Sequence, residues 1–267
     1  MLYEELLASC KDRFDEFFKN VPIFENQFTW NGYNDDCYRL MYMENSYEHI
    51  ATVKELKSEI PELTGLCKKC GQFFMPARNI SIPKYDVILG KQHEEALMDF
   101  LAEKLHTETC RADLTNRSLP DCKILKSDGT PAAYFEVKFH CAPFIMALQK
   151  TGRYCYEGSA TLDYKKIEKQ LSLIDELDAP VFYVHWIEYP CLKGVFFETS
   201  EQVKKYISEQ HELFEREKRE GDDQKSSSAV YLKKMYSPLL NMGSFETFVD
   251  LLRDLVNNTS KAGAENG

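Results

Sequence analysis

The sequence predicts an α/β protein in which a mixed central sheet is flanked by helices. Three observations indicate this class. Residues 90–106 carry apolar side chains at helical spacing, residues 121–140 have the pattern of a β-hairpin, and residues 180–188 form a mostly apolar run typical of a buried strand. A helix, a hairpin, a helix and a strand in this order indicate a sheet covered by helices.

The other elements follow from apolar spacing and from turn residues along the chain. We expect helices over residues 2–19, 46–58, 163–177, 200–219 and 244–257, and short strands over residues 193–199 and 230–235. Asp163 is expected to cap the helix that follows it. The segment GDDQKSSSA, residues 221–229, is expected to form a loop or linker, and the residues from Asn258 onward a disordered tail.

Composition excludes several classes of protein. No apolar stretch of the 267 residues is long enough to span a membrane, and acidic residues in the first helix argue against a secretory signal. Nine cysteines without regular spacing favour reduced thiols and a cytoplasmic or nuclear compartment. A net charge of -10 argues against a general nucleic-acid coat, but residues 119–170 contain eight basic against six acidic side chains.

The hairpin sequence LPDCKILKSDGTPAAYFEVKFH, residues 119–140, places two acids opposite each other. Asp128-Gly129 predicts a two-residue turn in which Ser127 pairs with Thr130, so that paired residue numbers sum to 257. Asp121 then lies directly opposite Glu136 on the same face. A loop with an odd number of residues would instead separate the two carboxylates, and Pro131 predicts an irregularity near the turn.

The second hairpin strand alternates between two kinds of side chain. Phe135, Val137 and Phe139 point to one face, and Glu136, Lys138 and His140 point to the other. Two opposed carboxylates are unfavourable unless a cation lies between them. Because Mg²⁺ prefers oxygen ligands, the pattern predicts a divalent-metal site for Mg²⁺ or Mn²⁺.

The combination of Pro120-Asp121 with Glu136-Val137-Lys138, between two helices and before a strand, resembles the PD-(D/E)xK nuclease superfamily. This restriction-endonuclease-like pattern covers roughly residues 86–200. A second ExK, at residues 55–57, lies on an expected helix without an opposed acid and is discounted.

The resemblance implies roles for several residues. Asp121, Glu136 and the backbone carbonyl of Val137 would hold one or two divalent ions. Lys138 would act beside the attacking water and the phosphate. Gly90-Lys-Gln-His-Glu94 fits a further motif of the family and adds Glu94 as an acid, with His93 as the alternative ligand.

Helical spacing places Glu94 on the apolar face of its helix, where a buried carboxylate needs a partner. The alternative interpretation is that Glu94 is an ordinary acid in the first turn of its helix. His140 is interpreted as a polar strand residue, and His185 and Trp186 as core. On the helix at 163–177, side chains that could contact phosphates are Lys165, Lys169 and Gln170, with a solvated face as the alternative.

Cys67 and Cys70 form a CxxC pair, which is half of a structural zinc site. No second CxxC completes it, so the alternative is a pair of reduced cysteines in a turn. No phosphate-binding glycine loop and no local Ser-His-Asp or Cys-His signature is recognisable in the sequence.

These observations divide the chain into a mainly helical N-terminal accessory region (1–85), a nuclease core (86–200), a C-terminal extension packed on the core (201–257) and a tail (258–267). We expect a divalent-metal-dependent nuclease, with DNA favoured over RNA and an endonuclease over an exonuclease. The alternatives are an RNA endonuclease of the same fold, and an inactive nucleic-acid or protein interaction module with a zinc docking element.

Overall fold

The structure is a computed structural model. It describes residues 2–19, 83–113, 115–116, 118–140, 159–189, 192–210, 215–217, 231–238 and 241–257. The described residues form five helices and a mixed sheet of six strands, so the predicted α/β class is confirmed.

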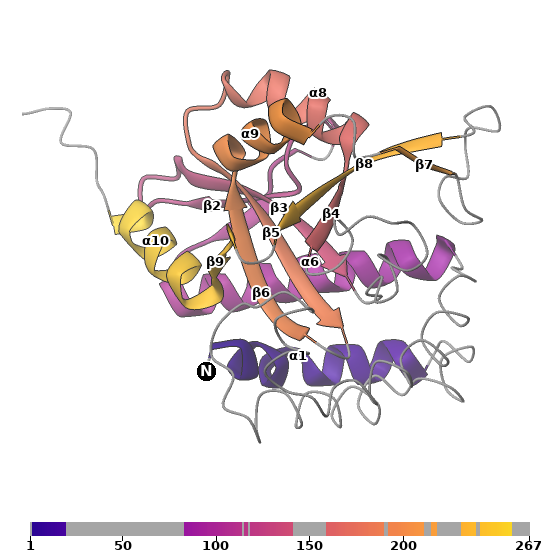
Figure 1. The fold of residues 1–267 in the computed structure, drawn as a ribbon. Helices are drawn as coiled ribbons and strands as arrows, with labels where there is room; N and C mark the ends of the chain where they lie inside the picture. Colours follow the sequence, from indigo (N-terminus) through magenta and orange to yellow (C-terminus); the bar gives the residue numbers. More distant parts are fainter. Residues whose placement is uncertain are drawn as a thin grey trace, which may run out of the picture.

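The main sheet has the strand order β1-β2-β3-β5-β6-β9 (Figure 1). Its strands are β1 (Thr109–Arg111), β2 (Cys122–Leu125), β3 (Pro131–His140), β5 (Val181–Tyr189), β6 (Leu192–Thr199) and β9 (Gly243–Ser244). Strands β3 and β5 run parallel, and every other pair of neighbours is antiparallel. The β3 strand is therefore central and has neighbours on both sides.

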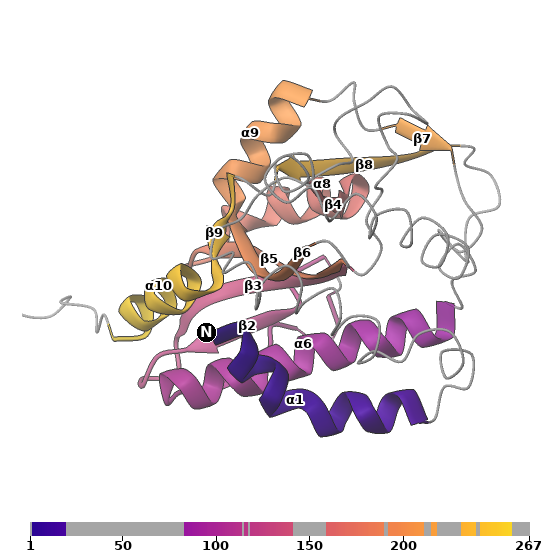
Figure 2. The same ribbon diagram turned by 60° about the horizontal axis from the view of Figure 1, so that its bottom comes forward.

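Three helices share a hydrophobic core with one face of this sheet: α1 (Leu2–Lys19), α6 (Pro83–Leu105) and α10 (Phe245–Asn257). Figure 2 shows α1 and α6 on the side of the sheet opposite to α8 and α9. The core includes Leu6 and Phe14 of α1, Leu97 of α6, Phe135 of β3 and Phe248 of α10. The predicted helical N-terminal region therefore begins with a helix that belongs to the main core.

The other face of the sheet is covered by α8 (Tyr164–Ile174), by α9 (Ser200–Gln210) and by a second sheet with the order β4-β8-β7. The strands of this second sheet are β4 (Ser159–Asp163), β8 (Tyr231–Pro238) and β7 (Glu215–Glu217). A smaller apolar cluster joins these elements to β5 through Leu162, Ile167, Tyr183, Val203 and Met235.

The β2–β3 hairpin has the predicted register but not the predicted turn. Lys126 donates to the carbonyl of Thr130 and accepts from Gly129, so the loop has three residues, with Gly129 at a φ of 82°. This odd loop shifts the pairing next to the turn to Leu125 opposite Pro131. An irregularity between Ile124 and Leu125 then restores the predicted sum of 257.

Two further expectations differ from the structure. The helix expected over 200–219 ends at Gln210, and Glu215–Glu217 pairs with β8 instead. Strand pairing across the second sheet thus outweighs the helical propensity of this charged run. Residues 159–163, where the sequence predicts no strand, form β4, which pairs along its whole length with β8.

Other predicted elements agree with the structure or lie outside the described residues. The helix expected at 90–106 begins earlier, at Pro83, because proline is tolerated in a first helical turn. The expected helix at 46–58, the Cys67–Cys70 pair, the 221–229 loop and the tail from Asn258 lie outside the described residues.

Among the described helices, none combines the length and apolar character needed to cross a lipid bilayer.

Candidate functional site

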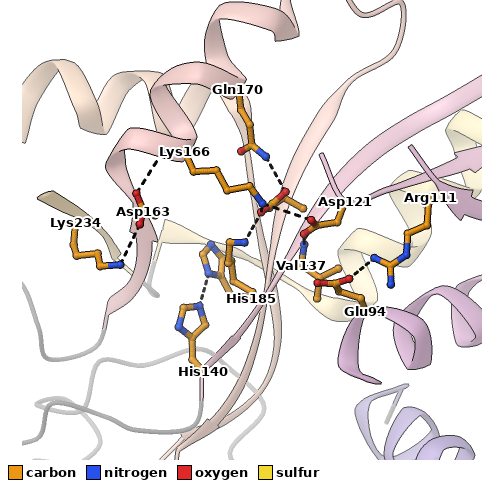
Figure 3. A network of polar contacts seen from close by, with 12 residues as sticks. Glu94, Arg111, Asp121, Val137, His140, Asp163, Lys166, Gln170, His185 and Lys234 are labelled. Atoms are coloured by element: carbon orange, nitrogen blue, oxygen red, sulfur yellow. Dashed lines mark hydrogen bonds and ion pairs between the residues drawn. The ribbon is translucent and has the colours of Figure 1, made fainter. Parts of the chain in front are cut away.

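The carboxylates of Asp121 and Glu136 converge on one side of the main sheet. Asp121 directly precedes β2, and Glu136 lies in the middle of β3. The ammonium group of Lys166 contacts Glu136 Oε1 and lies 3.5 Å from Asp121 Oδ1 (Figure 3). A shared contact with one nitrogen requires both carboxylates to face the same side, as the hairpin register predicts.

Burial and charge affect these two acids differently. Burial and the neighbouring charge of Glu136 raise the pKa of Asp121 to about 6. Burial would also raise the pKa of Glu136, whose side chain is inaccessible to solvent, but the ammonium groups of Lys138 and Lys166 outweigh it and lower this pKa to about 2. The site therefore stabilises one carboxylate charge well and the second one poorly.

Lys138 lies two residues after Glu136 on the same face of β3 and contacts Glu136 Oε1. Burial opposes the charge of its ammonium group, but the carboxylates of Glu136 and Asp121 outweigh burial and raise the pKa of Lys138. Lys138 is consequently protonated at neutral pH. It can act as a positive hydrogen-bond donor, but not as a base.

Helix α8 supplies two more side chains to the cluster. Asp163 is its N-cap and accepts from the backbone N–H of Lys166, which fixes the first helical turn. Lys166 and Gln170 are four residues apart and point together toward the sheet. Gln170 is buried, and its Nε2 donates to Glu136 Oε2 over 2.8 Å.

The predicted pair Lys165 and Lys169 lies elsewhere on α8. Both side chains are exposed, whereas Lys166 and Gln170 adjoin the buried face that contains Ile167. Gln170 was expected to contact phosphate, and in the structure it holds a carboxylate. Sequence reasoning missed Lys166, although its spacing of four residues from Gln170 could have identified it.

The backbone of Val137 faces Asp121. The N–H of Val137 donates to Asp121 Oδ2 over 3.3 Å, while the N–H of Tyr134 donates in the other direction, to the carbonyl of Pro180. Because the N–H and C=O of one strand residue point to the same side, the carbonyl of Val137 also points toward Asp121. The carbonyl oxygen of Val137 is thus on the edge of β3 that faces Asp121.

Glu94 of α6 lies beside this group and pairs with Arg111 of β1 (Figure 3). Its negative charge adds to the effects that raise the pKa of Asp121. The predicted proximity of Glu94 to the acids is thus present, but its carboxylate already has a guanidinium partner. No sequence signal had identified Arg111.

His93 points into the hydrophobic core. Its ring stacks on Phe139 with centroids 3.6 Å apart and also contacts Phe14 and Trp186. Its Nδ1 lies 2.8 Å from the carbonyl of Leu89. The structure therefore corrects the expectation that His93 can replace Glu94 as a ligand, because the ring lies among the aromatic side chains of the other face.

His140 and His185 form a second polar group, in which His185 is buried and His140 is partly buried. His140 Nε2 lies 3.0 Å from His185 Nδ1, and His185 Nε2 lies 2.9 Å from Glu198 Oε1. Burial, with the positive charges nearby, lowers the pKa of His140 well below its usual value. His185 and Trp186 are fully buried, as expected of core residues.

The donors at the convergence point fit a hard divalent ion. They are the carboxylates of Asp121 and Glu136 and the carbonyl of Val137, and Mg²⁺ sites commonly combine one or two carboxylates with water and phosphate. No cluster of three or more His, Cys, Asp or Glu side chains is arranged as a metal site within the described part of the chain. Any ion here would compete with Lys166 for the two carboxylates.

Comparisons with known proteins are sparse. No protein-family model and no curated protein matches the chain. Among solved structures it is similar to D212, described as a nuclease from a fusselovirus, with a TM-score of 0.35 and 12% sequence identity, over 65% of this chain and 91% of that one. A similarity of this size does not establish a shared family.

Proposed function

We propose that this protein is a divalent-metal-dependent nuclease of the PD-(D/E)xK type that hydrolyses phosphodiester bonds in nucleic acid. The observation that carries the proposal is the convergence of Asp121 and Glu136 on one cationic nitrogen, with the ammonium group of Lys138 alongside. A raised pKa at Asp121 fits a site whose second negative charge needs an additional cation.

In this proposal Asp121, Glu136 and the carbonyl of Val137 hold a Mg²⁺ or Mn²⁺ ion. When bound, such an ion makes water a stronger nucleophile at neutral pH and offsets charge on the scissile phosphate. Lys138, protonated and held by Glu136, donates to the phosphate oxygen on which negative charge develops. Glu94, paired with Arg111, adds negative charge near Asp121.

The favoured substrate is DNA, cleaved internally, and this preference rests on the resemblance to the PD-(D/E)xK superfamily. An RNA endonuclease of the same fold is the alternative, since the same residues can act on either backbone. Lys165 and Lys169, exposed on α8, are the proposed contacts to phosphates outside the scissile bond. Matched DNA and RNA substrates incubated with Mn²⁺ separate the two functions.

An inactive interaction module with zinc bound at Cys67 and Cys70 is the alternative from another class. The described site does not favour it, because a binding surface for phosphate gains nothing from two clustered acids. Calorimetric titration with Mn²⁺ distinguishes the classes: the nuclease proposal requires binding that Asp121→Ala weakens strongly.

Lys138→Ala is the variant that tests the proposed chemistry. We expect Mn²⁺ binding to persist and the cleavage rate to fall by about 10²–10³-fold, the usual cost of losing one donor to the transition state. Lys123→Ala on β2, which carries no assigned role, is the matched control. Loss of metal affinity equal to the loss of cleavage would contradict the role given to Lys138.

A further inference from the structure

Lys166 lies where the proposed metal ion would bind. Its Nζ contacts Glu136 Oε1 and is 3.5 Å from Asp121 Oδ1, so a single positive charge is placed between the two carboxylates (Figure 3). A divalent ion held by the same oxygens would bring two cations within a few ångströms of each other. The two occupants therefore exclude each other.

The metal-free protein needs such a counter-ion. Glu136 is completely buried, and an unpaired buried charge is strongly destabilising. Lys138 and Lys166 both contact Glu136, but only Lys166 has a described ion pair with Asp121 as well. Lys166 is thus the group that links the two acids when no metal is present.

The surroundings of Lys166 allow its side chain to leave without unfolding the site. About a third of this side chain is exposed, so a path to solvent exists. Asp163 holds the backbone of Lys166 through the N-cap, and Gln170 holds the second oxygen of Glu136. Rotation of one long side chain would open the carboxylates while α8 and Glu136 keep their places.

We propose that Lys166 is a resident counter-ion that stabilises the metal-free site and is displaced when a divalent ion binds. This proposal rests on the metal site of the proposed function. It adds that Lys166 and the divalent ion compete for the same carboxylates. Each metal-binding event must break the two ion pairs of Lys166, which weakens the apparent affinity for the metal. In return, Lys166 stabilises the folded protein when no metal is present.

The test compares wild type with Lys166→Met, which keeps the length and apolar stem of the side chain but removes its charge. Calorimetric titration with Mn²⁺ is expected to give a dissociation constant roughly tenfold lower for Lys166→Met. Thermal unfolding in EDTA is expected to give a lower Tm for this variant, and saturating Mn²⁺ to give a larger increase in Tm than in wild type.

Two further variants make the comparison specific. Lys205→Met removes an exposed lysine from the neighbouring helix α9 and is expected to leave the Mn²⁺ affinity unchanged. Lys166→Gln retains a hydrogen-bond donor for Glu136 and replaces Lys166→Met if the methionine variant does not fold. It is expected to bind Mn²⁺ more tightly than wild type for the same reason.

The outcomes separate the inference from the proposed function. If wild type binds Mn²⁺ through Asp121 but removal of the Lys166 charge leaves the affinity unchanged or lowers it, the counter-ion role is overturned and the metal site stands. If wild type and the Lys166 variants all fail to bind Mn²⁺, both the metal site and the inference are overturned.

Discussion

At the residue scale, Asp121 and Glu136 show how far alternation along a strand can predict a site. The side-chain period of a strand is two, so correct pairing places both acids on one face. A helix turns by about 100° per residue, and a choice wrong by one position moves a side chain to another face. Lys165 and Lys169 are the lysines predicted from the sequence, whereas the lysine at the carboxylates is Lys166, one position after Lys165.

Asp121 gives the first prediction at this scale. Its pKa in the folded protein, about 6, lies above the ordinary 3.8 of an aspartate, so protonation favours the folded state. The stability that the protonated Asp121 side chain contributes is complete below the pKa of the unfolded state and is lost as pH rises through 6. In EDTA at pH 7, Asp121→Asn is therefore expected to raise the free energy of unfolding by about 1–3 kcal/mol.

Chemical denaturation at two pH values checks this prediction. The gain should shrink toward pH 4, and the exposed Asp178→Asn should change little at either pH. With saturating Mn²⁺ the order should reverse, because only wild type keeps both carboxylates for the ion. A loss of stability in EDTA at pH 7 would show that the Asp121 charge is well compensated.

At the element scale, the β2–β3 hairpin has the predicted register, but its turn and the pairing next to the turn differ from those predicted. The Asp128-Gly129 pair belongs to a three-residue loop, and the irregularity between Ile124 and Leu125 compensates the odd length. Pro131 signalled an irregularity because it cannot donate to the ladder, but not its direction. Two local deviations thus cancel before the strand reaches Glu136.

Helix α8 gives the prediction at this scale. Asp163 caps its N-terminus, and Asp163→Ala is expected to lower the free energy of unfolding by about 1 kcal/mol. Because the cap fixes the turn that carries Lys166, the ion pair with Asp121 should weaken as well. Equilibrium unfolding in urea measures the loss.

The control for this prediction is Asp163→Asn. Asparagine is an equally good N-cap, so this variant should recover most of the stability even though the ion pair with Lys234 is lost. Equal losses in the alanine and asparagine variants would instead assign the effect to Lys234.

At the scale of the whole molecule, the helices at the two ends of the described chain complete one core. Side chains of α1 and α10 pack with α6 and with the face of the sheet that lies opposite the carboxylates. The sequence predicted both helices from their apolar spacing. It placed them outside the central region because spacing within a helix does not identify the surface on which the helix packs.

Phe14 tests whether α1 is an integral part of this core. The ring is buried against His93 and Trp186, and Phe14→Ala is expected to cost about 3–5 kcal/mol of stability. Lys11→Ala, on the exposed side of the same helix, should cost less than about 0.5 kcal/mol. A cost below about 1 kcal/mol for Phe14→Ala would mean that α1 is an appendage.

The most direct test of the account is a crystal structure of the protein soaked with Mn²⁺, in which anomalous scattering locates the ion. We expect one ion bound by Asp121, Glu136 and the carbonyl of Val137 at about 2.1–2.3 Å, with the Lys166 ammonium group moved away from both carboxylates. A Lys166 side chain still bridging the two acids, with manganese absent from them at saturating concentration, would contradict the metal site and the nuclease proposal together.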